Sequence, residues 1–162
     1  MITNQTRIRM LEGVRRVLGG PEAALQSAAL PWRKSGKEIE ILLITSRGTG
    51  RWVLPKGWPE KGETMSESAA REAAEEAGVE GPADEDKTGV YFYDKELRNG
   101  VLRRCEVHVF ALRVRKLAKD WPESDQRQRK WFPVAKAASL VDEPDLGELI
   151  AGFGGKPAKS QG

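Results

Sequence analysis

The chain has 162 residues, which is enough for one ordinary domain and too few for two domains of full size. Hydrophobic residues make up 39% and charged residues 31%, a composition typical of a folded protein rather than a disordered one. The 27 basic and 24 acidic residues leave a net charge of +3, which is too small an excess to indicate a nucleic-acid-binding arm. No apolar run approaches the roughly 18 residues of a membrane span, so we expect neither nucleic acid nor membrane as a partner.

The two ends of the chain differ from its middle. Residues 1–20 carry four arginines against one glutamate and lack the apolar stretch of a secretory signal. We interpret them as a basic leader or a short helix docked on the domain, with an organelle-targeting segment as the alternative. Residues 155–162 are small and polar, which predicts a flexible tail, so a single domain is expected over 21–154. Cys105 is the one cysteine, which favours a reducing compartment and a cytoplasmic location.

The first predicted elements are strands. Alternating apolar residues predict strands over Ala23–Trp32 and Ile39–Thr45, and Ser35-Gly36 between them predicts a hairpin turn. A short extended segment follows at Arg51–Leu54 and ends at Pro55, which disfavours helix at the preceding residue.

A helix is predicted next, over Thr64–Ala77, where strong helix formers dominate. Thr64 or Ser66 can cap its first turn, and Gly78 suits the end of a helix, where the backbone often adopts a positive φ. The remaining elements expected are strands at Gly89–Lys95, Leu102–Arg115 and Lys130–Pro133 and helices at Val134–Val141 and Asp145–Phe153. Strands followed by helices in this order predict an α/β (α+β) fold, with a mixed sheet packed between helices.

Three carboxylates crowd one face of the predicted central helix. At 100° per residue, Glu72, Glu75 and Glu76 fall close together, and like charges at this spacing repel. A solvated acidic face is the simpler interpretation of three glutamates alone. The alternative is a site for a hard divalent cation such as Mg²⁺, which takes oxygen ligands and keeps water for a phosphate substrate.

The spacing around these glutamates decides between the two interpretations. It reads Gly57, five residues, Glu63, seven residues, then Arg71-Glu72-Ala73, one residue, Glu75-Glu76, one residue, and Gly78-Val79. This resembles the Nudix box, Gx5Ex7REUxEExGU with U aliphatic, and matches it at every position. The resemblance implies a Nudix fold, a mixed sheet sandwiched between helices, and metal-dependent hydrolysis of a diphosphate-containing substrate with Mg²⁺ or Mn²⁺ as cofactor.

The resemblance also implies a role for each residue of the motif. Glu72 and Glu76 would be metal ligands, with the carbonyl of Gly57 near the metal, and Glu75 would be a ligand or the base that activates water. Glu63 would support the site from the loop, and Arg71 would hold the carboxylates by charge-assisted hydrogen bonds.

Residues 23–153 further resemble the diphosphoinositol polyphosphate phosphohydrolase branch, whose members also cleave diadenosine polyphosphates. The likeness lies in the sequence Arg51–Gly57 and in the segments at 120–123 and 127–132. Lys56–Pro59 departs from the glycine-rich turn of the animal members. This branch implies a polyphosphorylated small-molecule substrate, and the oligomeric state stays open.

Basic residues gather around the motif in the sequence, which indicates an anionic substrate. Arg127, Arg129 and Lys130 form a late basic cluster. Trp58 could stack on a nucleotide base or pack against the rest of the protein. The predicted substrate-binding residues are Arg47, Arg51, Lys56, Arg98, Arg103, Arg129 and Lys130.

Two other classes of function remain open. One is a Nudix pyrophosphohydrolase of nucleoside triphosphates, nucleotide sugars or RNA 5′ ends. The other is a non-catalytic module that binds nucleotides or RNA, against which the three retained glutamates argue.

Overall fold

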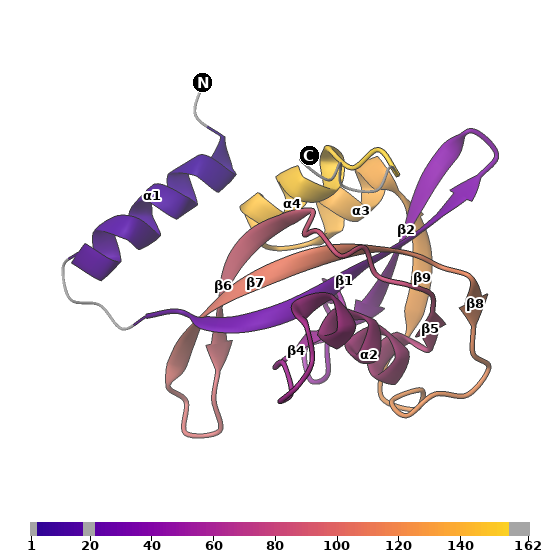
Figure 1. Ribbon diagram of the computed structural model, residues 1–162, viewed down its shortest axis with the longest axis horizontal. Helices are drawn as coiled ribbons and strands as arrows, with labels where there is room; N and C mark the ends of the chain where they lie inside the picture. The colour runs from indigo at the N-terminus through magenta and orange to yellow at the C-terminus, as the bar shows by residue number, and fades with distance from the viewer. Residues whose placement is uncertain (1–2, 18–21, 156–162) are drawn as a thin grey trace.

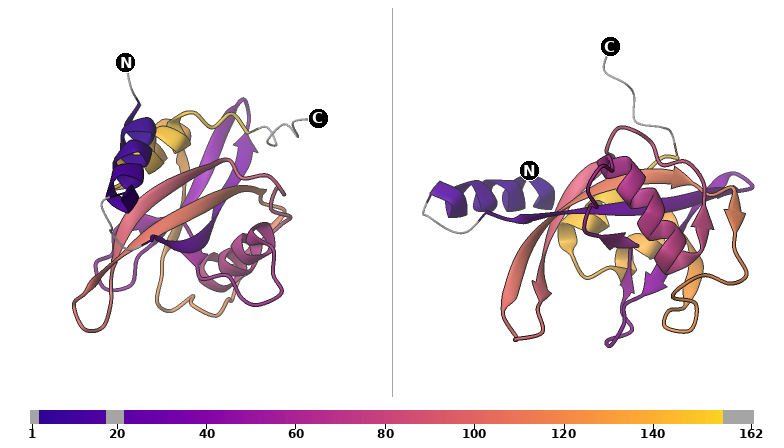
Figure 2. Two further views of the ribbon diagram at one scale, coloured as in Figure 1. Left: turned by 60° about the vertical axis from the view of Figure 1, so that its left-hand side comes forward. Right: turned by 60° about the horizontal axis from the view of Figure 1, so that its bottom comes forward.

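The computed structural model describes residues 3–17 and 22–155, and in them a mixed β-sheet lies between helices, as predicted (Figures 1 and 2). The main sheet runs β3-β2-β1-β7-β6, with β4 added on β1 and β9 on β2. It is mixed because β1 and β7 are parallel whereas the other pairs are antiparallel. Its strands are β1 (Ala24–Ser35), β2 (Glu38–Thr45), β3 (Trp52–Val53), β4 (Lys56–Gly57), β6 (Gly89–Glu96), β7 (Leu102–Arg113) and β9 (Arg129–Pro133).

The predicted hairpin is confirmed, with Ser35 paired to Glu38 and Gly36 in the turn at φ +63°. β1 runs three residues past its predicted end because it continues to pair with β2 up to that turn. Three strands were not predicted: β4, β5 (Val79–Glu80) and β8 (Lys116–Leu117), the last two forming a separate small sheet. Each has two residues, too few to leave an alternating pattern.

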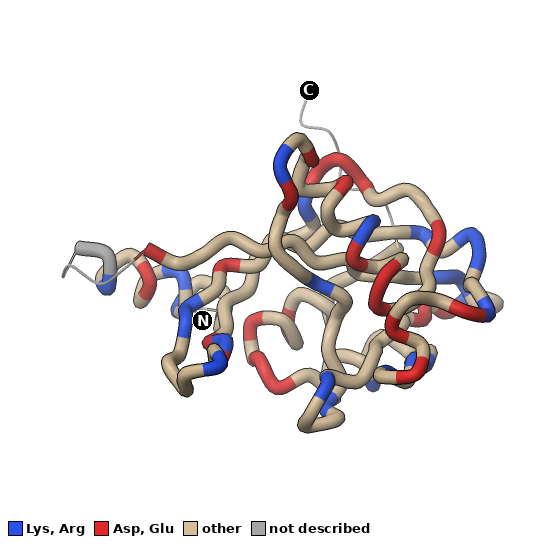
Figure 3. Tube along the Cα trace, turned by 90° about the horizontal axis from the view of Figure 1, so that it is seen from below, with Lys and Arg blue, Asp and Glu red and all other residues tan. Residues whose placement is uncertain are grey.

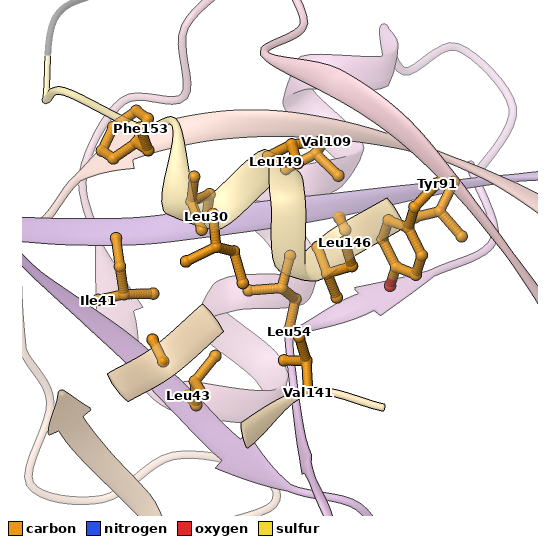
Figure 4. Packing of buried hydrophobic residues seen from close by; sticks show 14 of the residues in the cluster. Leu30, Ile41, Leu43, Leu54, Tyr91, Val109, Val141, Leu146, Leu149 and Phe153 are labelled. Atoms are coloured by element: carbon orange, nitrogen blue, oxygen red, sulfur yellow. The ribbon is translucent and has the colours of Figure 1, made fainter. Parts of the chain in front are cut away.

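Two apolar cores lie on opposite faces of the sheet because successive side chains of β1 point to opposite sides. Ala28, Leu30 and Trp32 contribute to the core beneath α3 (Val134–Leu140) and α4 (Pro144–Ala151). Figure 4 shows Leu30 in this core among side chains from the sheet and α4. Ala29 points the other way, into the core beneath α2 (Met65–Ala77). Figures 1 and 2 accordingly show α2 and the α3–α4 pair on opposite sides of the sheet.

The start of α2 is held by a capping box. The Thr64 side chain accepts from the backbone N–H of Glu67, and the Glu67 carboxylate accepts from the backbone N–H of Thr64. Ala69, Ala73 and Ala77 are fully buried against the sheet, so a stripe of small side chains lets the helix approach closely.

The end of α2 is held by side chains from two later segments. Gly78 takes the left-handed conformation at φ +63°, and Trp121 Nε1 donates to the Glu76 carbonyl at 3.0 Å. Arg129 donates to the carbonyls of Ala77 at 2.8 Å and Ala118 at 2.6 Å, and its guanidinium stacks 3.9 Å from the Trp121 ring centroid. These contacts satisfy carbonyls that a helix end otherwise leaves unpaired. They therefore set the position of the last turn of α2, where Glu75 and Glu76 lie.

Within the predicted leader, α1 (Asn4–Val17) is a helix that packs beside the edge strand β6 and against α4. Ile8 joins a small apolar cluster with Val90 and Phe92 of β6, and Gln5 Nε2 donates to the Asp145 carbonyl at 3.2 Å. The remainder of that leader and residues 156–162 of the predicted tail lie outside the described residues. Among the described helices, none has the length and apolar character that crossing a bilayer requires.

The cap at the end of α2 generates a stability prediction. Arg129→Gln should lower the free energy of unfolding by about 1–3 kcal/mol, because the carbonyls of Ala77 and Ala118 lose their charged donor. Urea unfolding followed by far-UV circular dichroism measures the change. Lys130→Gln, which removes the neighbouring exposed cation, is the control and should stay within about 0.5 kcal/mol of the parent. Equal effects of the two substitutions would contradict the capping role.

Candidate active site

An open cleft of about 880 Å³ brings together α2, the segment from β3 to β4, the turn after β2, and β6. The loop before β9 adds Glu123 and Arg127 to its wall. Five of the six predicted motif residues line it, namely Gly57, Arg71, Glu72, Glu75 and Glu76, whereas Glu63 lies outside the lining and is bound to Arg71. The glutamates of α2 and the loop residue Gly57 therefore lie at one surface, as the sequence pattern predicts.

Arg71 donates hydrogen bonds to three glutamates at the cleft. Its Nε donates to Glu63 Oε2 at 2.7 Å and its Nη2 to Glu63 Oε1 at 3.0 Å, a bidentate pair. Its Nη1 contacts Glu72 Oε1 at 2.9 Å and Glu75 Oε2 at 3.4 Å. The hydrogen bonds from Arg71 lower the pKa of Glu63 below its ordinary value. One guanidinium therefore connects the loop carboxylate to two carboxylates of α2.

Glu76 is one of the two buried glutamates of α2. Its carboxylate accepts from the Lys56 backbone N–H at 3.2 Å and lies 3.4 Å from Arg127 Nη2. Burial raises the pKa of Glu76 to about 7, although the positive charges of Arg127 and Lys56 act in the opposite direction. The ionised form of Glu76 is thus incompletely compensated by the protein, which is the condition under which a bound cation stabilises a carboxylate.

Gly57 faces the other buried carboxylate. A Cβ atom at Gly57 would collide with the carboxylate of Glu72, so any larger residue there has to push that carboxylate aside. Burial raises the pKa of Glu72 as well, and Arg71 opposes the rise. The glycine of the motif is therefore required by the close approach of β4 to α2.

The donor set fits a hard divalent cation. Glu72 and Glu76 lie one helical turn apart, both 8% exposed, on the side of α2 that faces the cleft. Within the described ranges, no group of three or more His, Cys, Asp or Glu side chains is placed to hold a metal ion, so the site would rest on two carboxylates. Two carboxylates, with a third, Glu75, held by Arg71, leave coordination positions for water and substrate phosphate, as Mg²⁺ prefers.

The structure places the predicted substrate-binding residues in two groups. Arg47, Arg51 and Lys56 line the cleft. Arg98, Arg103 and Lys130 are not among its lining residues. Arg98 lies in the turn beyond the part of β6 that lines the cleft, Arg103 lies on β7, and Lys130 is exposed on β9. Arg129 is also outside the lining and caps α2 instead. These four residues lie outside the cleft lining, and their part in substrate binding stays a prediction.

Arg127 is the member of the late basic cluster that reaches the cleft. Its Nε donates to Glu123 Oε1 at 3.1 Å and its Nη1 to the Thr45 carbonyl at 3.1 Å, so it ties the loop before β9 to β2 beside Glu76. The sequence indicated a cluster here but could not tell its members apart. Arg127 precedes β9, and the loop conformation there, tied to Thr45 and Glu123, brings its guanidinium beside Glu76.

The cleft wall is not dominated by basic residues. Figure 3 shows acidic and basic residues interleaved over the side of the molecule seen from below. Each of the four arginines in the cleft wall contacts a carboxylate, including Arg47 with Glu123 at 3.7 Å. Trp58 is 43% exposed at the cleft, where Lys95 Nζ lies 5.8 Å from its ring centroid.

Lys56 lies at the inner side of this cleft. Burial lowers the pKa of Lys56 to about 8, against the opposing charges of Glu76 and Glu143. Its Nζ lies 5.0 Å from the ring centroid of Tyr93, whose hydroxyl donates to Gln26 Oε1 at 2.6 Å. Tyr93 and Gln26 were not predicted as site residues, because in the sequence they are ordinary positions of alternating strands.

Comparison with known proteins agrees with this site. The NUDIX domain family model matches residues 25–153. Nudix hydrolase 12, mitochondrial, from Arabidopsis thaliana is 38% identical over 106 residues, covering 64% of this chain and 52% of that protein. This chain thus spans about half the length of that relative. Diphosphoinositol polyphosphate phosphohydrolase 3-alpha from Mus musculus is 34% identical over 124 residues, covering 75% of this chain and 71% of that protein.

The fold is also found among solved structures. The crystal structure of Caenorhabditis elegans Ap4A hydrolase superposes with a TM-score of 0.60, covering 80% of this chain and 95% of that one, at 22% sequence identity. The family match spans most of the chain, and it includes every residue of the motif assembled in the cleft. This protein belongs to the Nudix hydrolase family.

Proposed function

We propose that this protein is a Mg²⁺-dependent hydrolase of phosphoanhydride bonds, with Mn²⁺ as a substitute metal. The observation that carries the proposal is the pair of buried carboxylates, Glu72 and Glu76, on the cleft side of α2, with Gly57 packed against the first. Burying two like charges one turn apart is unfavourable, and Arg71 and Arg127 offset it only in part, because burial still raises the pKa of both carboxyls. A phosphate substrate bound to that cation would occupy the open side of the cleft.

Each residue of the motif has its own proposed role in hydrolysis. When bound by Glu72 and Glu76, with the Gly57 carbonyl nearby, the metal would neutralise the diphosphate and lower the pKa of the attacking water. Arg71 holds Glu63, Glu72 and Glu75 in a fixed arrangement. Glu75 lines the cleft and is 46% exposed on its side chain, so it could accept a proton from a water in the cleft.

For the substrate, we propose a diphosphoinositol polyphosphate or a diadenosine polyphosphate. The names of the mouse relative and of the nematode structure support these two classes. Arg47, Arg51 and Lys56 in the cleft wall can contact phosphate oxygens, and the exposed ring of Trp58 can stack on a base. The alternatives are nucleoside triphosphates, nucleotide sugars and RNA 5′ ends, or binding without turnover.

We further propose a cytoplasmic location, which the single buried cysteine supports through its preference for a reducing compartment. The Arabidopsis relative is named mitochondrial, so imaging of the tagged full chain against organelle markers is the test.

The metal-ligand role of Glu76 predicts loss of turnover on neutralisation. Glu76→Gln should lower kcat by about 100-fold or more, since removing residues that merely support metal ligands already costs 10–100-fold. Phosphate release with Mg²⁺ measures it, and the thermal midpoint checks the fold. Glu80→Gln, an exposed glutamate just beyond α2, is the charge-matched control and should retain full activity. Full activity of Glu76→Gln would refute the metal site.

The close approach at Gly57 predicts that even one methyl group is disruptive. Gly57→Ala should displace the Glu72 carboxylate and lower kcat by about tenfold or more, by analogy with a 1 Å misplacement of catalytic groups. Titration with Mn²⁺, followed by its paramagnetic signal, should show weakened metal binding. Gly154→Ala is the matched control, because a Cβ there meets nothing within 4 Å. Unchanged metal affinity in Gly57→Ala would contradict the packing argument.

The substrate proposal predicts an ordered activity profile. In parallel assays with Mg²⁺, a diphosphoinositol polyphosphate or a diadenosine polyphosphate should be turned over with a higher kcat/KM than nucleoside triphosphates, nucleotide sugars or triphosphorylated RNA. A chelator should abolish the activity, and added Mg²⁺ or Mn²⁺ should restore it. Failure of the folded protein to cleave either proposed class would overturn the substrate assignment but not the metal site.

A further inference from the structure

Arg51 is held in the cleft wall by a loop far away in the sequence. Its Nη1 contacts Glu143 Oε1 at 3.0 Å and Asp142 Oδ2 at 3.3 Å. Both carboxylates belong to the connection between α3 and α4, more than 90 residues after Arg51. The guanidinium side chain is 34% exposed and lines the cleft, so it is accessible to substrate while paired with two acids.

The side chain of Glu143 is used for this pair and not for its local helix. Glu143 occupies the N-cap position of α4, where a side-chain oxygen commonly accepts a helix N–H, yet it makes no such bond. Its side chain is 13% exposed and reaches Arg51 instead, whereas that of Asp142 is 69% exposed. The less exposed of the two acids is therefore the one at 3.0 Å from Arg51.

Asp142 and Glu143 do not themselves line the cleft and reach it through Arg51, unlike the carboxylates in its wall. Arg71 and Arg127 contact Glu72 and Glu76, the proposed metal ligands, so their partners serve the metal site itself. Asp142 and Glu143 lie outside the motif and contact neither of those ligands in the described structure. Arg51 and its two partners sum to a charge of −1, and neighbouring Lys56 brings the group to zero. The two acids therefore cancel the attraction that Arg51 and Lys56 would otherwise have for a dense group of phosphates.

We propose that Glu143 and Asp142 are specificity-determining residues that disfavour substrates with densely clustered phosphates and favour linear dinucleoside polyphosphates. The inference rests on the proposed function, since it assigns a preference to the same cleft. A linear polyphosphate presents few charges at any one place, whereas a phosphorylated ring presents several together and has to displace two carboxylates from Arg51. The carboxylates therefore act on the choice of substrate and not on the bond cleavage.

The test is a binding comparison on the full chain without divalent metal, so that no phosphoanhydride is cleaved. Titration calorimetry at fixed ionic strength measures inositol hexakisphosphate, a ring with clustered phosphates, and diadenosine tetraphosphate, a linear one. The double variant D142N/E143Q keeps the size of both side chains and removes their charges. It should bind the ring about tenfold more tightly, as expected for removing two charges near a phosphate site, and the linear ligand less than threefold more tightly.

Matched variants make the result specific to Arg51. Glu38→Gln removes one exposed negative charge from the β1–β2 hairpin, outside the cleft, and should change neither affinity. Asp142→Asn alone changes the more exposed of the two positions and keeps the test valid if the double variant is unstable. It should show a smaller increase in affinity for inositol hexakisphosphate than the double variant. Adding Arg51→Gln to the double variant should remove the increase in affinity for inositol hexakisphosphate.

Three results would overturn the proposal. They are an unchanged or weaker affinity of the double variant for inositol hexakisphosphate, an equal gain for both ligands, or a gain that persists without Arg51. None of these depends on turnover, so the outcome is separate from that of Glu76→Gln, which tests hydrolysis. A protein that binds as predicted but does not cleave would refute the proposed function and leave this specificity intact.

Discussion

The geometry of the candidate active site depends on one guanidinium, which contacts carboxylates that would otherwise repel each other. Arg71 contacts Glu63 from the loop and Glu72 and Glu75 from α2, and its bidentate pair with Glu63 fixes the loop against the helix. A surface ion pair of this kind contributes little to stability, but here it sets geometry. Without it, crowded negative charges on one helix face would splay, and the cleft would lose its ordered rim.

The helix that carries these acids is fixed at both ends by unrelated parts of the chain. Its start depends on its own sequence, through the capping box of Thr64 and Glu67. Its end depends on Trp121 and Arg129, which arrive from a loop and a strand some 45 to 52 residues later. The buried glutamates near that end can therefore hold their positions without a metal. Such preorganisation lowers the cost of binding one.

Local elements were predictable where the signal is local. The hairpin with Gly36, the helix from Thr64 and the spacing from Gly57 to Val79 all follow from residues close in sequence, and the structure confirms those elements and the gathering of the motif in one cleft. The two-residue strands β4, β5 and β8 were missed, because pairing with a distant partner and not the pattern of their own side chains defines them.

The basic residues show where sequence proximity stops being informative. Arg127 and Arg129 are two positions apart, yet one lies beside Glu76 in the cleft and the other caps α2.

By itself, the sequence determined the family, the metal-binding chemistry expected of it and the helix that carries the glutamates, because each is encoded in short-range spacing on a periodic backbone. Only the tertiary structure decided which cations reach the cleft and which acids accompany them. The contact between Arg51 and Glu143 joins segments 92 residues apart, and it exists because the connection between α3 and α4 is packed beside β3. Long-range contacts of this kind follow from sheet register and core packing, which no local pattern of residues specifies.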